Sequence, residues 1–238
     1  MKVSILHIGK TAGTALFAAI RQAKTDNKII LHGHAFSIHT VWKKFPQRNV
    51  IFGVREPLAR YVSSFNSRLR EGLPRHHTPW TKSEQVAFSL FPTPNALAEA
   101  LSSSSPMERA AAELSMLGIK HVSKPMSSYL GSVDNLRKNK EKIKFVYLTE
   151  TFDQDFEIMR RMLSLGEVSP PKDDVGAHKM PDEMDTRLSD KARENLMRWY
   201  QKDLEIYDYC KTMHQQFIEK LGEGATAAGA QRIVQTVA

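Results

Sequence analysis

The chain has 238 residues, of which 41% are hydrophobic and 25% are charged, a length that suits one or two globular domains. No apolar run approaches the roughly 20 residues of a membrane-spanning helix, so the composition predicts a soluble protein without a membrane span. The formal net charge of +8 favours phosphate, sulfate or an acidic polymer as a partner. Lysines and arginines are scattered along the chain instead of forming one block, which argues against a nucleic acid.

The N-terminus and the cysteine content both favour a cytoplasmic protein. Residues 1–10 contain a short apolar run but no long apolar segment or cleavage site of a signal peptide. Cys210 is the only cysteine, so no intrachain disulfide can form, as in proteins of a reducing compartment. We expect Cys210 to be a thiol that packs in or near the core.

Short β-rich apolar runs alternate with helical segments along the chain, which is the pattern of a parallel sheet with helices on both faces. The predicted strands are residues 2–8, 29–31, 50–54 and 145–148. The predicted helices are residues 15–23, 57–70, 96–101, 107–117, 152–163 and one long amphipathic helix over 189–220. The sequence therefore predicts an α/β fold with a central parallel sheet.

Three segments lack a sustained hydrophobic period. Residues 72–94 are interpreted as a long loop, and the pair His76-His77 as loop histidines because no third metal ligand accompanies them. Residues 172–185 form a polar, charged loop. Residues 222–238 are rich in glycine and alanine and are predicted to be a flexible tail.

A first motif, Gly9-Lys10-Thr11-Ala12-Gly13-Thr14-Ala15, lies directly between a predicted strand and a predicted helix. Small residues at a helix N-terminus let backbone N–H groups surround an anion, and Lys10 adds a positive charge. A Walker A motif has a glycine five positions before its Gly-Lys pair, where this chain has Ser4. The motif predicts a phosphate-binding loop distinct from an ATPase P-loop, and an ordinary tight turn is the alternative.

A second motif runs from Arg55 to Ser63, again between a strand and a helix. Arg55 follows the carboxyl end of its strand, where parallel α/β sheets hold their ligands. Ser63 lies about two turns along the helix that follows. An arginine and a hydroxyl suit a second phosphate, although a surface arginine and a helix serine remain the alternative. Arg60 is either a further phosphate contact or a solvated helix residue.

The element His32-Gly33-His34 lies between these two motifs. The three motifs together resemble the sulfotransferase family, in which the first loop binds the 5′-phosphosulfate and the second binds the 3′-phosphate of 3′-phosphoadenosine 5′-phosphosulfate (PAPS). The glycan branch is the most similar, particularly the heparan and chondroitin uronyl 2-O-sulfotransferases, in which Arg55-Glu56-Pro57 has the same spacing. The resemblance is good over residues 1–70 and weaker over 145–209. Residues 72–136 match almost nothing.

The resemblance implies a sulfotransferase fold of the P-loop nucleotide-kinase type over residues 1–221, with 72–136 as a variable acceptor-side insertion. It implies PAPS as donor, PAP as product and no required metal. His34 would be the general base, Lys10 would stabilise the leaving group and His32 would support the acceptor. The implied nucleotide-binding residues are Lys10, Thr11, Ala12, Gly13, Thr14, Ala15, Arg55, Ser63, His178 and Lys179.

Other interpretations stay open at this point. His32 and His34 can be a strand-end pair bound to the backbone, and His178 and Lys179 can be exposed loop residues. The animal relatives are membrane-anchored lumenal proteins with disulfides, so this chain resembles a bacterial cytosolic member, and we expect a hydroxylated acceptor, a saccharide. The rival functions are an ATP-dependent kinase that uses Lys10 and Thr11, and a non-enzymatic binder of nucleic acid or acidic polysaccharide.

Overall fold

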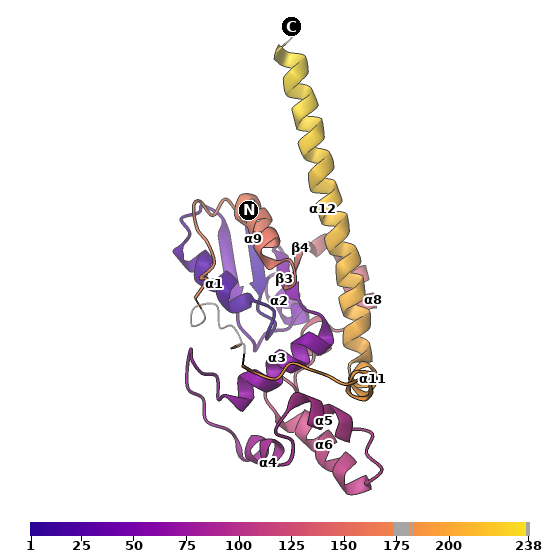
Figure 1. Ribbon diagram of the computed structural model, residues 1–238. Coiled ribbons are helices and arrows are strands. Elements are labelled where there is room, and N and C mark those ends of the chain that lie inside the picture. Colours follow the sequence, from indigo (N-terminus) through magenta and orange to yellow (C-terminus); the bar gives the residue numbers. More distant parts are fainter. Residues whose placement is uncertain (174–180, 182, 237–238) are drawn as a thin grey trace.

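The protein is built around one four-stranded parallel sheet (Figure 1). The computed structural model describes residues 1–173, 181 and 183–236, with side chains described up to Leu221. The strands, in the spatial order β2-β1-β3-β4, are β1 (Lys2–Leu6), β2 (Lys28–His32), β3 (Asn49–Val54) and β4 (Ile143–Leu148). The predicted fold class, a central parallel sheet flanked by helices, is confirmed.

Helices cover both faces of the sheet because alternate strand residues point to opposite sides. One face packs on α1 (Gly13–Gln22) and α9 (Phe152–Met162), with Ile5 and Tyr147 in the shared cluster. The other face, which includes Phe52, packs on a second set of helices. These are α2 (Ile38–Lys44), α7 (Ser127–Leu130), α8 (Val133–Lys138) and the first turns of α12 (Gln201–Thr236). The chain enters β4 through the short 3-10 helix Lys140–Lys142.

A third apolar cluster lies beyond the end of the sheet and is built mainly from helices (Figure 1). Its helices are α3 (Pro57–Leu69), α4 (Lys82–Leu90), α5 (Pro94–Ala100), α6 (Pro106–Gly118) and α11 (Asp190–Trp199). The fully buried pair Phe65 and Leu97 belongs to this cluster. α3 links the two parts, because it starts at the end of β3 and buries its other face among these helices.

The prediction of a loop over residues 72–94 is wrong for α4. Thr81 caps this helix: its hydroxyl accepts from the amide of Glu84, and the Glu84 carboxylate accepts from the amide of Thr81. α4 buries Ala87 and Phe88 but leaves Val86 exposed, so its hydrophobic residues do not form one stripe. This arrangement hides the helical period from the sequence.

The long helix predicted over residues 189–220 is two helices, α11 and α12, separated at Tyr200. The backbone of Tyr200 has φ −102° and ψ 23°, and its hydroxyl donates to the carbonyl of Val122 at 3.2 Å. α12 continues through the segment predicted to be a flexible tail and projects beyond the sheet (Figure 1). The flexibility of that segment stays a prediction.

Two further expectations concern Cys210 and the membrane. Cys210 lies on α12 and is fully buried in the cluster on the sheet, as predicted. Within the part of the chain that was searched, none of the helices combines the length and apolar character that a membrane crossing demands.

Candidate functional site

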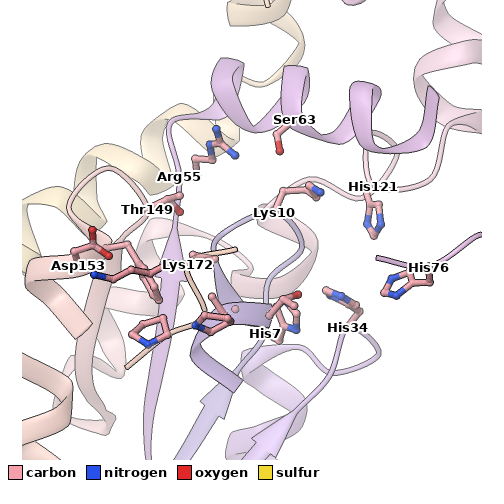
Figure 2. A pocket seen from close by; sticks show the side chains of 17 residues that line it. His7, Lys10, His34, Arg55, Ser63, His76, His121, Thr149, Asp153 and Lys172 are labelled. Carbon is pink, nitrogen blue, oxygen red and sulfur yellow. The ribbon is translucent and has the colours of Figure 1, made fainter. Parts of the chain in front are cut away.

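A cavity of about 550 Å³ opens at the carboxyl end of the sheet, where the predicted motifs meet (Figure 2). Its walls come from the loops that follow β1, β2, β3 and β4 and from the first turns of α1 and α3. The predicted site residues that line it are Lys10, Ala12, Gly13, Thr14, Ala15, His34, Arg55 and Ser63. The predicted motifs, which are separate in the sequence, therefore meet at the carboxyl edge of the sheet, as expected for ligand sites of parallel α/β sheets.

The loop between β1 and α1 has a backbone suited to an anion. Lys10 and Ala12 have left-handed backbones, with φ of 68° and 57°, and no side chain caps the N-terminus of α1. The first amides of α1 thus remain available to a ligand, and the helix dipole favours negative charge there. Gly13 is required at the start of the helix because a Cβ there would lie 2.1 Å from Cδ2 of His7.

Thr11 differs from its neighbours because its side chain is fully buried and does not line the cavity. Its hydroxyl donates to the carbonyl of Ile8 at 2.9 Å, which closes the turn of the loop. A hydroxyl used in this way is not presented to a nucleotide-bound Mg²⁺, as the kinase hypothesis requires. The Thr11 side chain therefore shapes the loop instead of contacting a ligand.

Positive charge is concentrated around this loop. Burial, together with the guanidinium groups of Arg70, Arg55 and Arg60, lowers the pKa of Lys10 to about 7. Burial also lowers the pKa of Arg55. Several cations held together in a low dielectric repel one another, and a ligand with several negative charges relieves this repulsion.

Arg55 and Ser63 both line the cavity, but Arg60 does not. The Arg60 side chain is buried, with Nε donating to the carbonyl of Gly9 at 2.9 Å and Nη2 donating to the carbonyl of Lys124 at 2.7 Å. Neither sequence interpretation of Arg60 fits these contacts, since it is neither a solvated residue nor a lining one. It links the phosphate loop to the segment that contains Lys124, which is distant in the sequence.

His34 lies beyond the end of β2 and lines the same cavity, and its Cε1 is 3.8 Å from the position that a Cβ on Gly9 of the phosphate loop would occupy. Its ring centroid is 4.1 Å from that of His7 and 5.8 Å from that of His121. Burial and the nearby Lys124 lower its pKa, while a hydrogen bond to the backbone of His7 acts in the opposite direction. The imidazole is therefore neutral at pH 7 and has a nitrogen that can accept a proton.

His32 does not reach the cavity, contrary to its predicted place beside the acceptor. Nε2 of His32 lies 3.0 Å from Oγ of Ser4, and its buried ring packs between Phe36 and Phe45. The reason is that His32 is still part of β2 and points to the sheet face, whereas His34 follows the strand. His32 fits the alternative interpretation, a packed histidine at the end of a strand.

The remaining predicted nucleotide contacts, His178 and Lys179, lie outside the described residues. The neighbouring part of their loop is described, and Lys172 from it lines the cavity.

Several lining residues were missed by the sequence reasoning. They are His7, His76, His121, Thr149, Phe152, Asp153, Pro170, Pro171 and Lys172. His7, Thr149 and Phe152 follow strands β1 and β4, a position from which a ligand contact is predictable. His121 carried no such signal, since it lies between two helices of the unmatched segment. Although histidines gather here, the searched residues contain no group of three or more His, Cys, Asp or Glu side chains that could hold a metal ion.

A cationic loop at a helix N-terminus, an arginine after β3 and a histidine in the same cavity define an α/β protein with a site suited to a multiply charged anion. The sequence model of the sulfotransferase family matches residues 2–210, and the chain belongs to this family. Its chemistry is therefore sulfuryl transfer to a hydroxyl-bearing acceptor, and members of the family generally use PAPS as the donor. A comparison with curated proteins gave no match.

Proposed function

We propose that this chain is a PAPS-dependent O-sulfotransferase that acts on a hydroxyl of a saccharide. The observation that carries the proposal is the arrangement of one cavity, in which Lys10 and Arg55 line one side and His34, next to Gly9 of the phosphate loop, lies at the other end from Arg55 (Figure 2). A donor with two separate anionic groups fits the first side. An acceptor hydroxyl that must lose a proton fits the second.

The residues present fit PAPS in charge and in polarity. The amides at the start of α1 and Lys10 would hold the 5′-phosphosulfate, and Arg55 with Ser63 would hold the 3′-phosphate. Phe152 supplies an apolar wall that suits a planar base. When bound, PAPS supplies the sulfuryl group and a bridging oxygen that gains negative charge as its bond to sulfur breaks.

Lys10 would stabilise that oxygen. Its ammonium group is buried among arginines, which lower its pKa to about 7. A phosphosulfate beside it reverses this shift and keeps Lys10 charged. A positive charge already in place where negative charge develops lowers the barrier without reorganisation of solvent.

His34 would accept the proton of the acceptor hydroxyl. Burial and Lys124 lower the pKa of its ring, so the neutral form is present at pH 7. The hydrogen bond to the backbone of His7 fixes the orientation of the ring and leaves the other nitrogen free to act as a base.

The surroundings of His34, just outside the cavity lining, favour a polar, anionic acceptor. Nζ of Lys124 donates to the carbonyl of His34 and lies 4.3 Å from the centroid of the Tyr129 ring. This cation beside the base would attract an acceptor that carries carboxylate or sulfate groups, as acidic saccharides do. A simple phenol offers no such group.

Isothermal titration calorimetry with PAP and AMP tests the donor assignment. We expect the protein to bind PAP without added metal and much more tightly than AMP. Arg55→Ala should reduce this preference by roughly 10- to 100-fold, the value of a charge-assisted hydrogen bond. Arg137→Ala is the matched control, because Arg137 is exposed and pairs only with Asp134 among the ion pairs of the described residues. Equal affinity of the wild type for PAP and AMP contradicts the proposal.

Transfer of labelled sulfate from PAPS tests the acceptor assignment. The panel should contain neutral saccharides, acidic saccharides, phenols and lipid alcohols, because these differ in charge and in hydroxyl acidity. We expect saccharides to be sulfated, with acidic ones preferred. Transfer confined to phenols would show that the acceptor assignment is wrong while leaving the donor assignment intact.

A further inference from the structure

Residues 119–124 lie between α6 and α7 and donate hydrogen bonds to, or accept them from, residues that are distant in the sequence. The Glu84 carboxylate accepts from the amide of Lys120 at 3.1 Å. The Tyr200 hydroxyl donates to the carbonyl of Val122 at 3.2 Å. Glu84 lies on α4 and Tyr200 at the junction of α11 and α12, so two separate elements hold this connection in one conformation.

The same segment is also linked to the phosphate loop and to the loop that carries His34. Arg60 donates to the carbonyl of Gly9 in the phosphate loop and to the carbonyl of Lys124 at the end of the segment. The ammonium group of Lys124 donates to the carbonyl of His34. The position of residues 119–124 is therefore set relative to the phosphate loop and to the loop that carries His34.

At the centre of this segment, His121 has a strained backbone and directs its ring into the cavity (Figure 2). Its φ is 66°, a left-handed conformation that is unfavourable for a residue with a side chain and persists only where the surroundings enforce it. Its ring centroid lies 5.8 Å from that of His34, with the two rings inclined at 64°. Nδ1 lies 3.3 Å from the position that a Cβ on Gly9 would occupy, so the ring packs on the phosphate loop.

We propose that His121 donates a hydrogen bond to an oxygen of the sulfuryl group while that group is transferred. This proposal rests on the proposed function, because it assumes that the sulfuryl group passes between Lys10 and His34. In the transfer, the bond from sulfur to the bridging oxygen of PAPS breaks as the bond from sulfur to the acceptor oxygen forms. The acceptor proton goes to His34, and His121 neither gives nor takes a proton.

The surroundings of His121 suit a donor better than a base. Burial, with Lys10 and His34 next in importance, lowers the pKa of His121 to about 3, so its ring is neutral and carries one N–H group at pH 7. Within the described part of the chain, no backbone hydrogen bond raises this pKa, whereas one does so for His34. His34 is thus the better proton acceptor of the two. The N–H of His121 is then available to contact the sulfuryl group during its transfer.

The left-handed backbone of His121 decides which substitutions test the proposal. Glycine and asparagine both accept this conformation, so neither His121→Gly nor His121→Asn adds backbone strain. His121→Gly removes the donor, while His121→Asn replaces it with an amide donor. Ser164→Gly is the matched control, because Ser164 is an exposed residue with φ 50° after α9.

The decisive measurement is the affinity for PAPS and PAP in the absence of an acceptor, followed by sulfate transfer. We expect His121→Gly to bind PAP like the wild type but PAPS about 3- to 10-fold more weakly, the value of one hydrogen bond. Its turnover should fall roughly 10- to 100-fold with little change in the KM of the acceptor, since the contact strengthens as charge shifts in the transition state. His121→Asn should retain most of both properties, and Ser164→Gly should match the wild type.

Unchanged PAPS affinity and turnover in His121→Gly would overturn the proposal. So would a loss in His121→Asn as large as that in His121→Gly, because the ring would then serve packing and not donation. These outcomes differ from failure of the proposed function, in which the wild type itself would bind PAP no better than AMP and the proposal would fall with it.

Discussion

Binding of PAP should be coupled to the uptake of a proton by Lys10. Burial and the charges of Arg70, Arg55 and Arg60 lower the pKa of this ammonium group from 10.5 to about 7 in the free protein. A bound phosphate group places negative charge beside it and restores its ordinary pKa. Between these two values the free protein lacks a proton that the complex holds, so binding weakens as the pH rises through this range.

The size of the effect follows from the pKa of Lys10. With a pKa of about 7, Lys10 is half protonated in the free protein at pH 7 and about one hundredth protonated at pH 9. The dissociation constant of PAP should therefore rise about 50-fold between these pH values. Proton uptake should grow from about half a proton at pH 7 to almost one at pH 9. The three arginines stay charged throughout and do not contribute.

Calorimetry in buffers of different ionisation enthalpy measures both quantities, since the observed enthalpy changes in proportion to the protons taken up. Lys10→Arg is the matched control, because a guanidinium group stays protonated in this pH range. Its PAP affinity should be nearly independent of pH. The reasoning is refuted if the wild type binds PAP equally well at pH 7 and pH 9, or if Lys10→Arg shows the same dependence as the wild type.

Two further predictions concern the base and the frame of the site. His34→Ala should leave PAP affinity nearly intact and lower turnover roughly 10²- to 10⁴-fold. The kcat/KM of the wild type for the acceptor, measured with saturating PAPS, should rise with pH through a group whose pKa is below 6.5, because burial and Lys124 lower the pKa of His34. If His34→Ala retains its turnover at saturating acceptor, the proton leaves by another route. Glu84→Gln should lower the free energy of unfolding in urea by roughly 3–5 kcal/mol, because Arg68 would be left as a buried charge without its counterion, at a present separation of 2.6 Å. Asp134→Asn breaks an exposed pair and should change it by less than about 1 kcal/mol, so equal losses would contradict the argument.

The parts of the fold that the sequence predicts are those in which local pattern and tertiary environment agree. β3 and β4 are buried on both faces, so their apolar runs stand out, and each is followed by polar residues. α3 begins with Pro57 at its first position and carries a clear apolar stripe. The phosphate loop is recognisable because its chemistry depends on consecutive residues.

The parts that the sequence did not predict depend on contacts between distant segments. Thr81 and Glu84 form a capping box that signals the start of α4, but Val86 and Leu90 are exposed on that helix and obscure its period. The break at Tyr200 interrupts an apolar stripe without a glycine or proline to mark it.

His32, which was assigned to the acceptor, and His121, which was not singled out, illustrate the same limit for the site. His32 and His34 are two residues apart, so their side chains would point to the same face of the sheet only if the strand continued through both. β2 ends at His32, so they point in different directions. His121 enters the cavity because Glu84, Arg60 and other residues from separate helices hold its segment. No motif within residues 119–124 predicts that His121 lies in the cavity.

The single thiol of the chain offers a native reporter of motion in α12. Cys210 is fully buried between this helix and the sheet, beside Tyr207 and Met213, and burial raises its pKa. A thiol reagent can therefore react with Cys210 only when α12 separates from the sheet, and the rate of the reaction measures how often this separation occurs. Because no other cysteine competes, the unmodified protein can be used to ask whether nucleotide at the carboxyl end of the sheet changes how often α12 opens.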